Sequence, residues 1–483
     1  MNLVIFLPDE MRAESLSCYG HPLVRTPYYD RLCEEGVRFD QCYVQHTVCT
    51  PSRCSLMTGW YPHVAGHRTL WHLLRPHEPS LLRDLRSAGY HIEWHGKNDL
   101  YSPGSFPLAL DTYTHEPGGH AGPNPYAIDD PHYYSFDYRP FPGGLHETGD
   151  MRNVQKGIDF LHSRAAQAAP FVLYLPLSMP HPPYAAPEPF HSMYDPADLP
   201  PLRPAGLPNK PDYYDLIRRY RRLDELDEPF FRRIQATYLG MCTYCDWMLG
   251  QLLRALDESG LADDTALIVS ADHGDWAGDY GLVEKWPSAL DEALTRVPLI
   301  IRAPNGKGGH VVREPMELLD VMATCYDLAG VRPQHTHFSR SLMPQLGGAA
   351  GDSRRAVFAE GGYDRHEPFA FEGRTASRGA SQAIFADRAQ IYYPKGLQQQ
   401  EHPDSVCRSV MIRLGDHKLV LRTHGVNELY DLKRDPRELD NRYDDPALAS
   451  IRADLKQRLL DWYVSTADVV PWDEDPRGLP PQR

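Results

Sequence analysis

Residues 48–59 read VCTPSRCSLMTG and follow an extended, partly apolar run over residues 37–44. Pro51 and Ser52 favour the first turn and the cap of a helix, so this pattern predicts that Cys49 lies at a helix N-terminus. Such an end attracts an anion, because free backbone N–H groups and the helix dipole point towards it. Arg53 adds a permanently charged guanidinium one turn later. The arrangement indicates a functional thiol; the alternative is a Cys in a turn before a core helix.

Short apolar runs alternate with amphipathic segments up to about residue 360. The predicted strands cover residues 3–7, 37–44, 90–95, 171–175, 266–270 and 295–302. The predicted helices cover residues 26–36, 80–88, 151–168, 232–258 and 316–328. This alternation predicts an α/β fold with a large, mainly parallel sheet sandwiched by helices.

The C-terminal part of the chain has a different pattern. Three short strands close in sequence, at 409–413, 418–422 and 427–431, predict a smaller antiparallel sheet. One helix over residues 448–464 follows them, and a Pro- and Asp-rich tail closes the chain. We therefore expect an α/β domain over residues 1–380 and an α+β subdomain over residues 381–483.

Composition narrows the possible partners and compartments. The net charge of −15 over 483 residues argues against non-specific binding to nucleic acid or to an anionic membrane. The nine Cys are scattered and odd in number, which favours a reducing cytosol over a disulfide framework. Cys242 and Cys245 have CxxC spacing, and we expect both side chains to pack in the core. No apolar run approaches the ~18 residues of a membrane span, and the start lacks a basic signal-peptide region, so we expect a cytoplasmic protein.

The residues with chemical potential share one position relative to the predicted sheet. Each follows a predicted buried strand, and together they are Asp9, Glu10, Lys97, His181, Asp272 and His273. The carboxyl ends of parallel strands meet at one edge of a sheet, so these side chains should converge. Residues 101–150 are rich in Pro, Gly, Tyr and His, and a loop of this length is usually functional. We interpret it as a wall of the site, with a surface decoration or an oligomer contact as open alternatives.

The types of side chain indicate the chemistry. Asp9, Glu10 and Asp272 offer oxygen ligands and His273 offers a nitrogen, a set that suits Ca²⁺, Mg²⁺ or Mn²⁺. A second group provides cations or proton donors: Arg53, Lys97, His181 and Lys285. A metal ion and several cations around one nucleophile suit a tetrahedral oxyanion ester, either a sulfate or a phosphate.

The order of these motifs resembles that of the formylglycine-dependent type I sulfatases of the alkaline-phosphatase-like superfamily, over nearly the whole chain. Residues 49–53, CTPSR, match the Cys-x-Pro-x-Arg motif, and residues 56–63, LMTGWYPH, match its extension. The family's later motifs and C-terminal domain are similar to residues 89–97, 180–184, 272–274, Lys285 with 295–298, and 428–436.

The resemblance implies a modified nucleophile and one metal ion. A separate formylglycine-generating enzyme would oxidise Cys49 to formylglycine during maturation. Asp9, Glu10, Asp272 and His273 would bind one divalent cation, with Ca²⁺ as the first expectation and Mn²⁺ or Mg²⁺ as alternatives. This domain, residues 1–380, would then be the catalytic one.

The resemblance also implies a sequence of steps. One hydroxyl of hydrated formylglycine 49 attacks sulfur, and the leaving alcohol is protonated by His181 or assisted by Lys285. The second hydroxyl then loses its proton and expels sulfate, which regenerates the aldehyde. Arg53 and Lys97 would orient the diol and the metal side of the site. The expected activity is that of an arylsulfatase-like sulfuric-ester hydrolase.

Three residues depart from the family pattern. Glu10 stands where an Asp is usual, His273 where Asn is frequent, and Asp99 where many members have His. The first two variations also occur in related phosphonate monoester hydrolases, so hydrolysis of a phosphonate monoester or phosphodiester is the alternative function. Lys97 and the C-terminal pattern favour a sulfatase. A non-catalytic relative would lack the nucleophile or a metal ligand, and none is missing. The alcohol released (aryl, sugar or alkyl) and a homo-oligomeric state stay open.

Overall fold

A large sheet forms the centre of the computed structural model, which describes residues 1–469 apart from 117–118, 164–165, 167, 365 and 368–386. Within those residues the sheet has nine strands, eight of them in the order β4-β3-β5-β1-β6-β7-β2-β8, with β9 paired to β2. Their bounds are β1 Asn2–Asp9, β2 Val37–Tyr43, β3 His91–His95, β4 Thr112–Thr114, β5 Phe171–Pro180, β6 Thr265–Ser270, β7 Arg296–Arg302, β8 His310–Val312 and β9 Met316–Glu317. The predicted fold class is confirmed.

The centre of the sheet is parallel. β1 pairs in parallel with β5 on one side, Leu3 opposite Val172, and with β6 on the other, Leu3 opposite Ala266. Every residue of β1 is buried, as expected for a strand covered on both faces. β7 is antiparallel to both β6 and β2, so the sheet is mixed on that side. The carboxyl ends of β1, β3, β5 and β6 therefore face the same edge.

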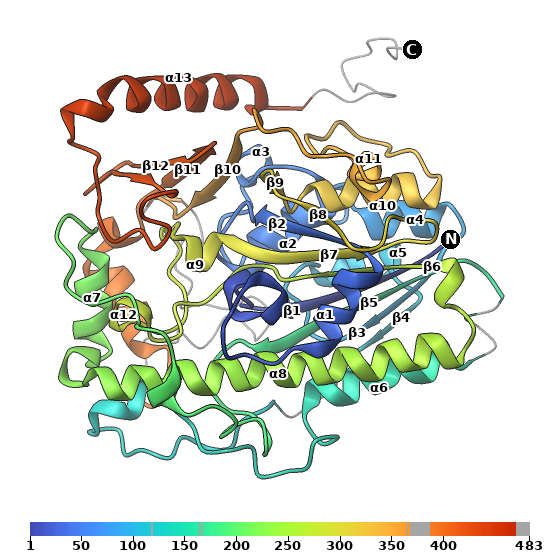
Figure 1. The fold of residues 1–483 in the computed structure, drawn as a ribbon, viewed down its shortest axis with the longest axis horizontal. Coiled ribbons are helices and arrows are strands. Elements are labelled where there is room, and N and C mark those ends of the chain that lie inside the picture. Colours follow the sequence, from blue (N-terminus) through green and yellow to red (C-terminus); the bar gives the residue numbers. More distant parts are fainter. Residues whose placement is uncertain (117–118, 164–165, 167, 365, 368–386, 470–483) are drawn as a thin grey trace.

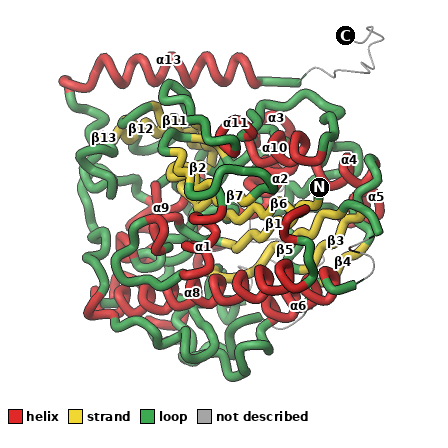
Figure 2. The backbone as a smooth tube through the Cα atoms, turned by 45° about the vertical axis from the view of Figure 1, so that its right-hand side comes forward, coloured by secondary structure: helices red, strands yellow, loops and turns green. Residues whose placement is uncertain are grey.

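Helices cover both faces of this sheet (Figure 1). α1 (Pro27–Glu35), α6 (Gly149–Leu161) and α8 (Glu228–Glu258) pack on one face, where α8 and α6 run side by side. α2 (Cys49–Thr58), α4 (Leu81–Ser87) and α10 (Asp320–Ala329) pack on the other face, and Figure 2 shows the sheet between the two layers. The shorter helices are α3 Pro62–Ala65, α5 Phe106–Ala109, α7 Tyr213–Tyr220, α9 Glu292–Thr295 and α11 Met343–Leu346.

A second sheet stands beside the first. Among the described residues it has four antiparallel strands, β10 (Val357–Gly361), β11 (Ser409–Leu414), β12 (His417–Arg422) and β13 (Glu428–Asp431). α13 (Ala449–Thr466) covers it and stacks Trp462 on Phe358, with ring centroids 4.6 Å apart. The expected domain boundary at residue 380 lies outside the described residues and stays a prediction, but β10, which precedes it, already belongs to this sheet.

Two predicted helices need correction, and a third helix was not predicted. The helix expected over 316–328 starts at Asp320, because Met316 and Glu317 pair with β2 as strand β9. α6 ends at Leu161, well short of residue 168, the expected end. α12 (Tyr393–Glu401) had no counterpart in the sequence interpretation; it packs against α7 of the first domain.

The cysteines do not form the disulfide framework that the sequence argued against. All nine lie within the described ranges, and none forms a disulfide. Cys242 and Cys245 are buried in α8 and belong to the hydrophobic core. Among the described residues, no helix is both long enough and apolar enough to cross a lipid bilayer.

Gly240 allows α8 to pack closely against the loop that contains Phe190. This close contact leads to a prediction about stability. A Cβ at this position would lie 2.0 Å from the carbonyl oxygen of Phe190. We expect Gly240→Ala to lower the free energy of unfolding by about 2–3 kcal/mol, although Ala is about 1 kcal/mol better than Gly in a helix. Thermal unfolding of the purified protein measures this.

Gly157 of α6 provides the matched control. The nearest atoms to a Cβ there belong to the side chains of Leu175, at 3.2 Å, and Leu173, at 3.4 Å, and side chains can move. Gly157→Ala should change stability by less than about 1 kcal/mol. If the two variants had the same free energy of unfolding, the close contact between Gly240 and the carbonyl oxygen of Phe190 would be contradicted.

Candidate active site

Four side chains from three elements meet at the carboxyl edge of the sheet. Asp9 ends β1, Asp272 and His273 follow β6, and Cys49 is the first residue of α2. One ligand atom from each lies within 4.8 Å of the others. All four side chains are at most 1 % exposed. The predicted convergence of strand ends is therefore present for these residues.

Arg53 fixes α2 against the two strand ends. Its Nε donates to Asp272 Oδ2 at 2.8 Å, and its Nη2 donates to Asp9 Oδ2 at 3.0 Å. The hydroxyl of Ser52 donates to the backbone carbonyl of Asp272 at 2.5 Å, so Ser52 does not cap the helix as expected. The start of α2 is held by tertiary contacts instead of a local cap.

The Cys49 thiol lies between the acidic and basic parts of the site. Its Sγ is 3.5 Å from Asp9 Oδ1, 3.3 Å from His273 Nε2 and 3.9 Å from Lys97 Nζ. Burial, together with the negative charge of Asp9, raises the pKa of the thiol well above its usual range. An unmodified Cys49 is therefore protonated at neutral pH and is a weak nucleophile.

Asp9 is ionised because cations surround it. Lys97 Nζ lies 2.5 Å from Asp9 Oδ2 and 2.7 Å from Asp99 Oδ2. Burial disfavours the charged form of Asp9, but the positive charges of Lys97 and Arg53 outweigh it and hold the pKa of Asp9 well below its usual range. Asp9 is thus a carboxylate and is available as a ligand.

Glu10, Lys285 and His181 form a second group beside the first. Lys285 Nζ contacts Glu10 Oε1 and lies 2.9 Å from His181 Nε2. His181 Nδ1 lies 2.6 Å from the carbonyl oxygen of Pro182, which assigns the proton to Nδ1 and leaves Nε2 as an acceptor for Lys285. Burial and the charges of Lys285 and Lys97 lower the pKa of His181 well below its usual range. His181 is therefore neutral, and Lys285 carries the proton of this pair.

The donor set fits a hard divalent cation. Asp9 and Asp272 provide carboxylate oxygens, and His273 Nε2 faces them because His273 Nδ1 donates to the carbonyl oxygen of Gly274 at 2.9 Å. The Glu10 carboxylate turns towards Lys285, while its backbone N–H donates to Asp272 Oδ1 at 3.2 Å. Within the described residues, Glu10 Oε2 is buried without a hydrogen-bond partner. Burial and the neighbouring carboxylate of Asp275 raise the pKa of Glu10 well above its usual range. The role of Glu10 in metal binding stays a prediction.

Several residues of the site were not singled out from the sequence. The Tyr184 hydroxyl donates to Asp275 Oδ1 at 2.7 Å and accepts the backbone N–H of Glu284 at 3.0 Å. It thereby joins the loops that carry His181, His273 and Lys285. Tyr184 lies within the stretch 180–184 and Glu284 directly precedes Lys285, so their proximity to site residues was a usable signal.

The segment over 101–150, expected to be one long loop, contains α5, β4 and the start of α6, and part of it lies against the His181 loop. Tyr184 and Phe141 donate backbone N–H groups to Phe136 and Ala186, at 2.8 and 3.0 Å. His120 Nε2 lies 2.9 Å from the carbonyl oxygen of Pro183. This placement suits a wall of the site, which stays a prediction.

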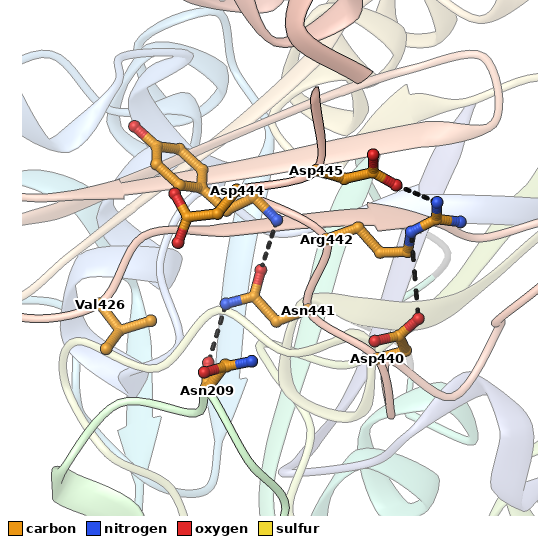
Figure 3. Close-up of a pocket in the computed structure, with 8 residues that line it drawn as sticks. Asn209, Val426, Asp440, Asn441, Arg442, Asp444 and Asp445 are labelled. Carbon is orange, nitrogen blue, oxygen red and sulfur yellow. Dashed lines mark hydrogen bonds and ion pairs between the residues drawn. The ribbon is translucent and has the colours of Figure 1, made fainter. Parts of the chain in front are cut away.

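A separate cavity lies in the C-terminal part of the chain (Figure 3). Its volume is about 320 Å³, and its lining residues are Asn209, Val426 and 440–445. Asn441 Nδ2 donates to the carbonyl oxygen of Asn209 at 2.8 Å, and Arg442 pairs with Asp445. None of the predicted site residues lines it, so it is not the catalytic pocket.

The metal cluster gives a prediction that does not depend on activity. Adding CaCl₂ at about 100 times the dissociation constant should stabilise the protein by about 2.7 kcal/mol, visible as a higher thermal midpoint. His273→Ala removes a ligand without leaving Arg53 unpaired, and it should raise the Ca²⁺ concentration needed for half the effect by about tenfold or more.

Asp99→Ala is the matched control. Asp99 pairs with Lys97 but lies outside the four-residue cluster. Its removal should leave the Ca²⁺ effect within about twofold of the wild-type value. An equal loss in both variants would contradict the assignment of the cluster.

Comparison with known proteins shows the family of the chain. Residues 1–331 match the sulfatase family model, and residues 365–464 match the model for the C-terminal region of N-sulphoglucosamine sulphohydrolase. The multifunctional alkaline phosphatase superfamily protein PehA of Trinickia caryophylli is 28% identical over 529 aligned residues, covering 98% of this chain and 96% of that protein.

Solved structures show the same fold. The phosphonate monoester hydrolase of Agrobacterium radiobacter gives a TM-score of 0.76 at 22% identity and covers 96% of both chains. A protein solved in complex with its substrate D-glucosamine-2-N,6-O-disulfate gives a TM-score of 0.73 at 21% identity and covers 99% of both chains. Since the sulfatase model spans well over half of the sequence, the protein is an enzyme that belongs to the sulfatase family.

Proposed function

We propose that the protein hydrolyses sulfate monoesters, using formylglycine derived from Cys49 and one divalent cation, with Ca²⁺ as the first choice. The observation that carries this proposal is the position of Cys49 Sγ, among Asp9, Asp272 and His273 and within 3.9 Å of Lys97. A buried, protonated thiol is a poor nucleophile there, whereas an aldehyde hydrate at the same position supplies two hydroxyl groups. Maturation then requires a formylglycine-generating enzyme.

The residues around position 49 bind the ester and hold the nucleophile. Asp9, Asp272 and His273, with Glu10 as a fourth ligand, hold the cation, which supplies Lewis-acid stabilisation of negative charge on oxygen. Arg53 keeps the two Asp carboxylates in place. Lys97, which is close to both Asp9 and Cys49, stabilises charge on the oxygens of residue 49.

Lys285 and His181 serve the leaving group. Lys285 is charged: burial disfavours its ammonium form, but the neighbouring carboxylates of Glu10 and Glu284 outweigh burial and raise its pKa well above the usual range. Its Nζ donates to the neutral His181 Nε2 at 2.9 Å, and Nδ1 is bound to the carbonyl oxygen of Pro182. A proton that moves from Lys285 to Nε2 is therefore given from that same nitrogen to the departing alcohol. We propose this relay in place of a permanently protonated His181.

A second candidate function uses the same residues. The 28% identical relative is named as multifunctional, and the fold is shared with a phosphonate monoester hydrolase. Phosphonate monoesters or phosphodiesters are therefore the alternative substrates. For a sulfatase, a sulfated saccharide is a substrate class supported by the structural neighbour that binds a disulfated glucosamine.

The first test compares the two ester classes. Protein produced with a formylglycine-generating enzyme should hydrolyse para-nitrophenyl sulfate with a higher kcat/KM than para-nitrophenyl phenylphosphonate. Mass spectrometry of the peptide that contains residue 49 should show the mass of formylglycine, which is lower than that of Cys. A higher kcat/KM for the phosphonate would favour the alternative function.

Cys49→Ala tests the nucleophile. It should abolish turnover of both esters, because no hydroxyl replaces the aldehyde hydrate, and should leave the thermal midpoint nearly unchanged. Cys54→Ala is the control: Cys54 is buried one turn further along α2, and its Sγ donates to the carbonyl oxygen of His72 at 3.8 Å. Its removal should lower stability but keep kcat. Turnover by a folded Cys49→Ala protein would refute the proposal.

His181→Ala tests the relay. Loss of proton transfer should slow esters of poor leaving groups by about 10²-fold or more and esters of good leaving groups much less. Rates with phenyl sulfate and para-nitrophenyl sulfate measure the difference. Equal slowing of both would assign His181 to binding the sulfate group.

A further inference from the structure

Glu284 has an unusual environment for a residue next to a reactive lysine. Its backbone is left-handed, with φ of +67°, and its side chain is 2 % exposed. A residue with a Cβ adopts this conformation only where surrounding contacts impose it. Two cations supply such contacts: Arg221 Nη2 lies 2.7 Å from Glu284 Oε2, and Lys395 Nζ lies 2.9 Å from Oε1.

The same Glu284 oxygen is close to Lys285. Oε1 lies 3.8 Å from Lys285 Nζ, which instead contacts Glu10 and His181. Two carboxylates therefore compete for one ammonium group, Glu10 in the site and Glu284 behind it. Lys395 occupies the Glu284 oxygen that would otherwise attract Lys285.

Lys395 also reaches the backbone of the catalytic loop. Its Nζ lies 3.5 Å from the carbonyl oxygen of Lys285 and 5.9 Å from the ring of Trp286. Lys395 belongs to α12, which the first domain holds in place: Arg221 donates to the carbonyl oxygens of Tyr134 and Ile391, at 3.1 and 3.4 Å. The ring of Tyr392, at the start of α12, packs 5.3 Å from that of Phe136.

We propose that Glu284 and Lys395 are positioning residues for Lys285, and that α12 is consequently a component of the active site. Lys395 neutralises Glu284, so that the Lys285 ammonium stays with Glu10 and His181, where it faces the ester. This inference rests on the proposed role of Lys285 in hydrolysis. It assigns to a C-terminal helix a part in a site otherwise built from the first domain.

The test uses three variants in the full-length, formylglycine-containing enzyme. Lys395→Met exposes the Glu284 carboxylate to Lys285, and kcat for phenyl sulfate should fall by about tenfold, with KM changed less than about threefold. Lys395→Arg restores the charge and should recover most of the rate. The double variant Glu284→Gln/Lys395→Met removes the competing anion and should be faster than Lys395→Met alone. Should Lys395→Met not fold, Lys395→Gln carries the same expectations.

Lys418→Met is the matched control. Lys418 is another fully buried lysine of the C-terminal part, paired with Glu292 and Glu438 away from Lys285. It should lose stability but keep kcat per folded molecule. A double variant no faster than Lys395→Met, or an equal loss of kcat in Lys418→Met, would overturn the inference, since either result indicates general loosening.

A crystal structure of Lys395→Met separates this inference from the proposed function. We expect Lys285 Nζ to move from 3.8 Å to hydrogen-bonding distance of Glu284 Oε1. An unmoved Lys285 would overturn the positioning role even in an active enzyme. Failure of the wild-type protein to hydrolyse any ester would refute the proposed function, and the position of Lys285 in the variant would still decide whether Lys395 controls it.

Discussion

The site depends on the ion pairs that the Arg53 guanidinium makes. It is fully buried and joins α2 to the ends of β1 and β6 through Asp9 and Asp272. Removing one partner from such a group leaves an uncompensated buried charge, at a cost of about 3–5 kcal/mol. The hydrophobic core builds the sheet, but this ion triad determines where the first turn of α2 lies. Cys49 reaches the metal ligands because Arg53, one turn later, holds the helix there.

The charges around Cys49 explain how an acidic protein can bind an anion. Asp9, Glu10 and Asp272 carry three negative charges, and Arg53, Lys97 and Lys285 carry three positive ones, so the formal sum is zero. The proposed divalent cation would make the site positive, whereas the whole chain has a net charge of −15. At close range in a buried site, these local charges outweigh distant ones, which solvent screens. The acidic surface then disfavours polyanions elsewhere on the molecule.

The positions of strand ends were predictable from the sequence, and the directions of side chains were not. Continuous apolar runs marked β1, β5 and β6, and the residues after them converge as the parallel arrangement requires. Glu10 is predicted beside Asp9 among the metal ligands, and that role stays a prediction; the sequence did not indicate that its backbone is left-handed and that its carboxylate contacts Lys285. Met316 reads as helical, yet it pairs with β2. The sequence pattern did not point to Lys395, because its proposed positioning role depends on contact with Glu284, more than a hundred residues earlier.

The burial of α2 has a consequence for the order of events in the cell. All ten residues of the helix are buried, and Cys49 is 1 % exposed. Another protein cannot bind this helix in the folded chain unless the helix first separates from Asp9, Asp272 and the core. The proposed oxidation of Cys49 would therefore have to take place before folding is complete, when the segment is still an accessible peptide. The rate of folding would then compete with the rate of modification, and a variant that folds faster would carry more unconverted thiol.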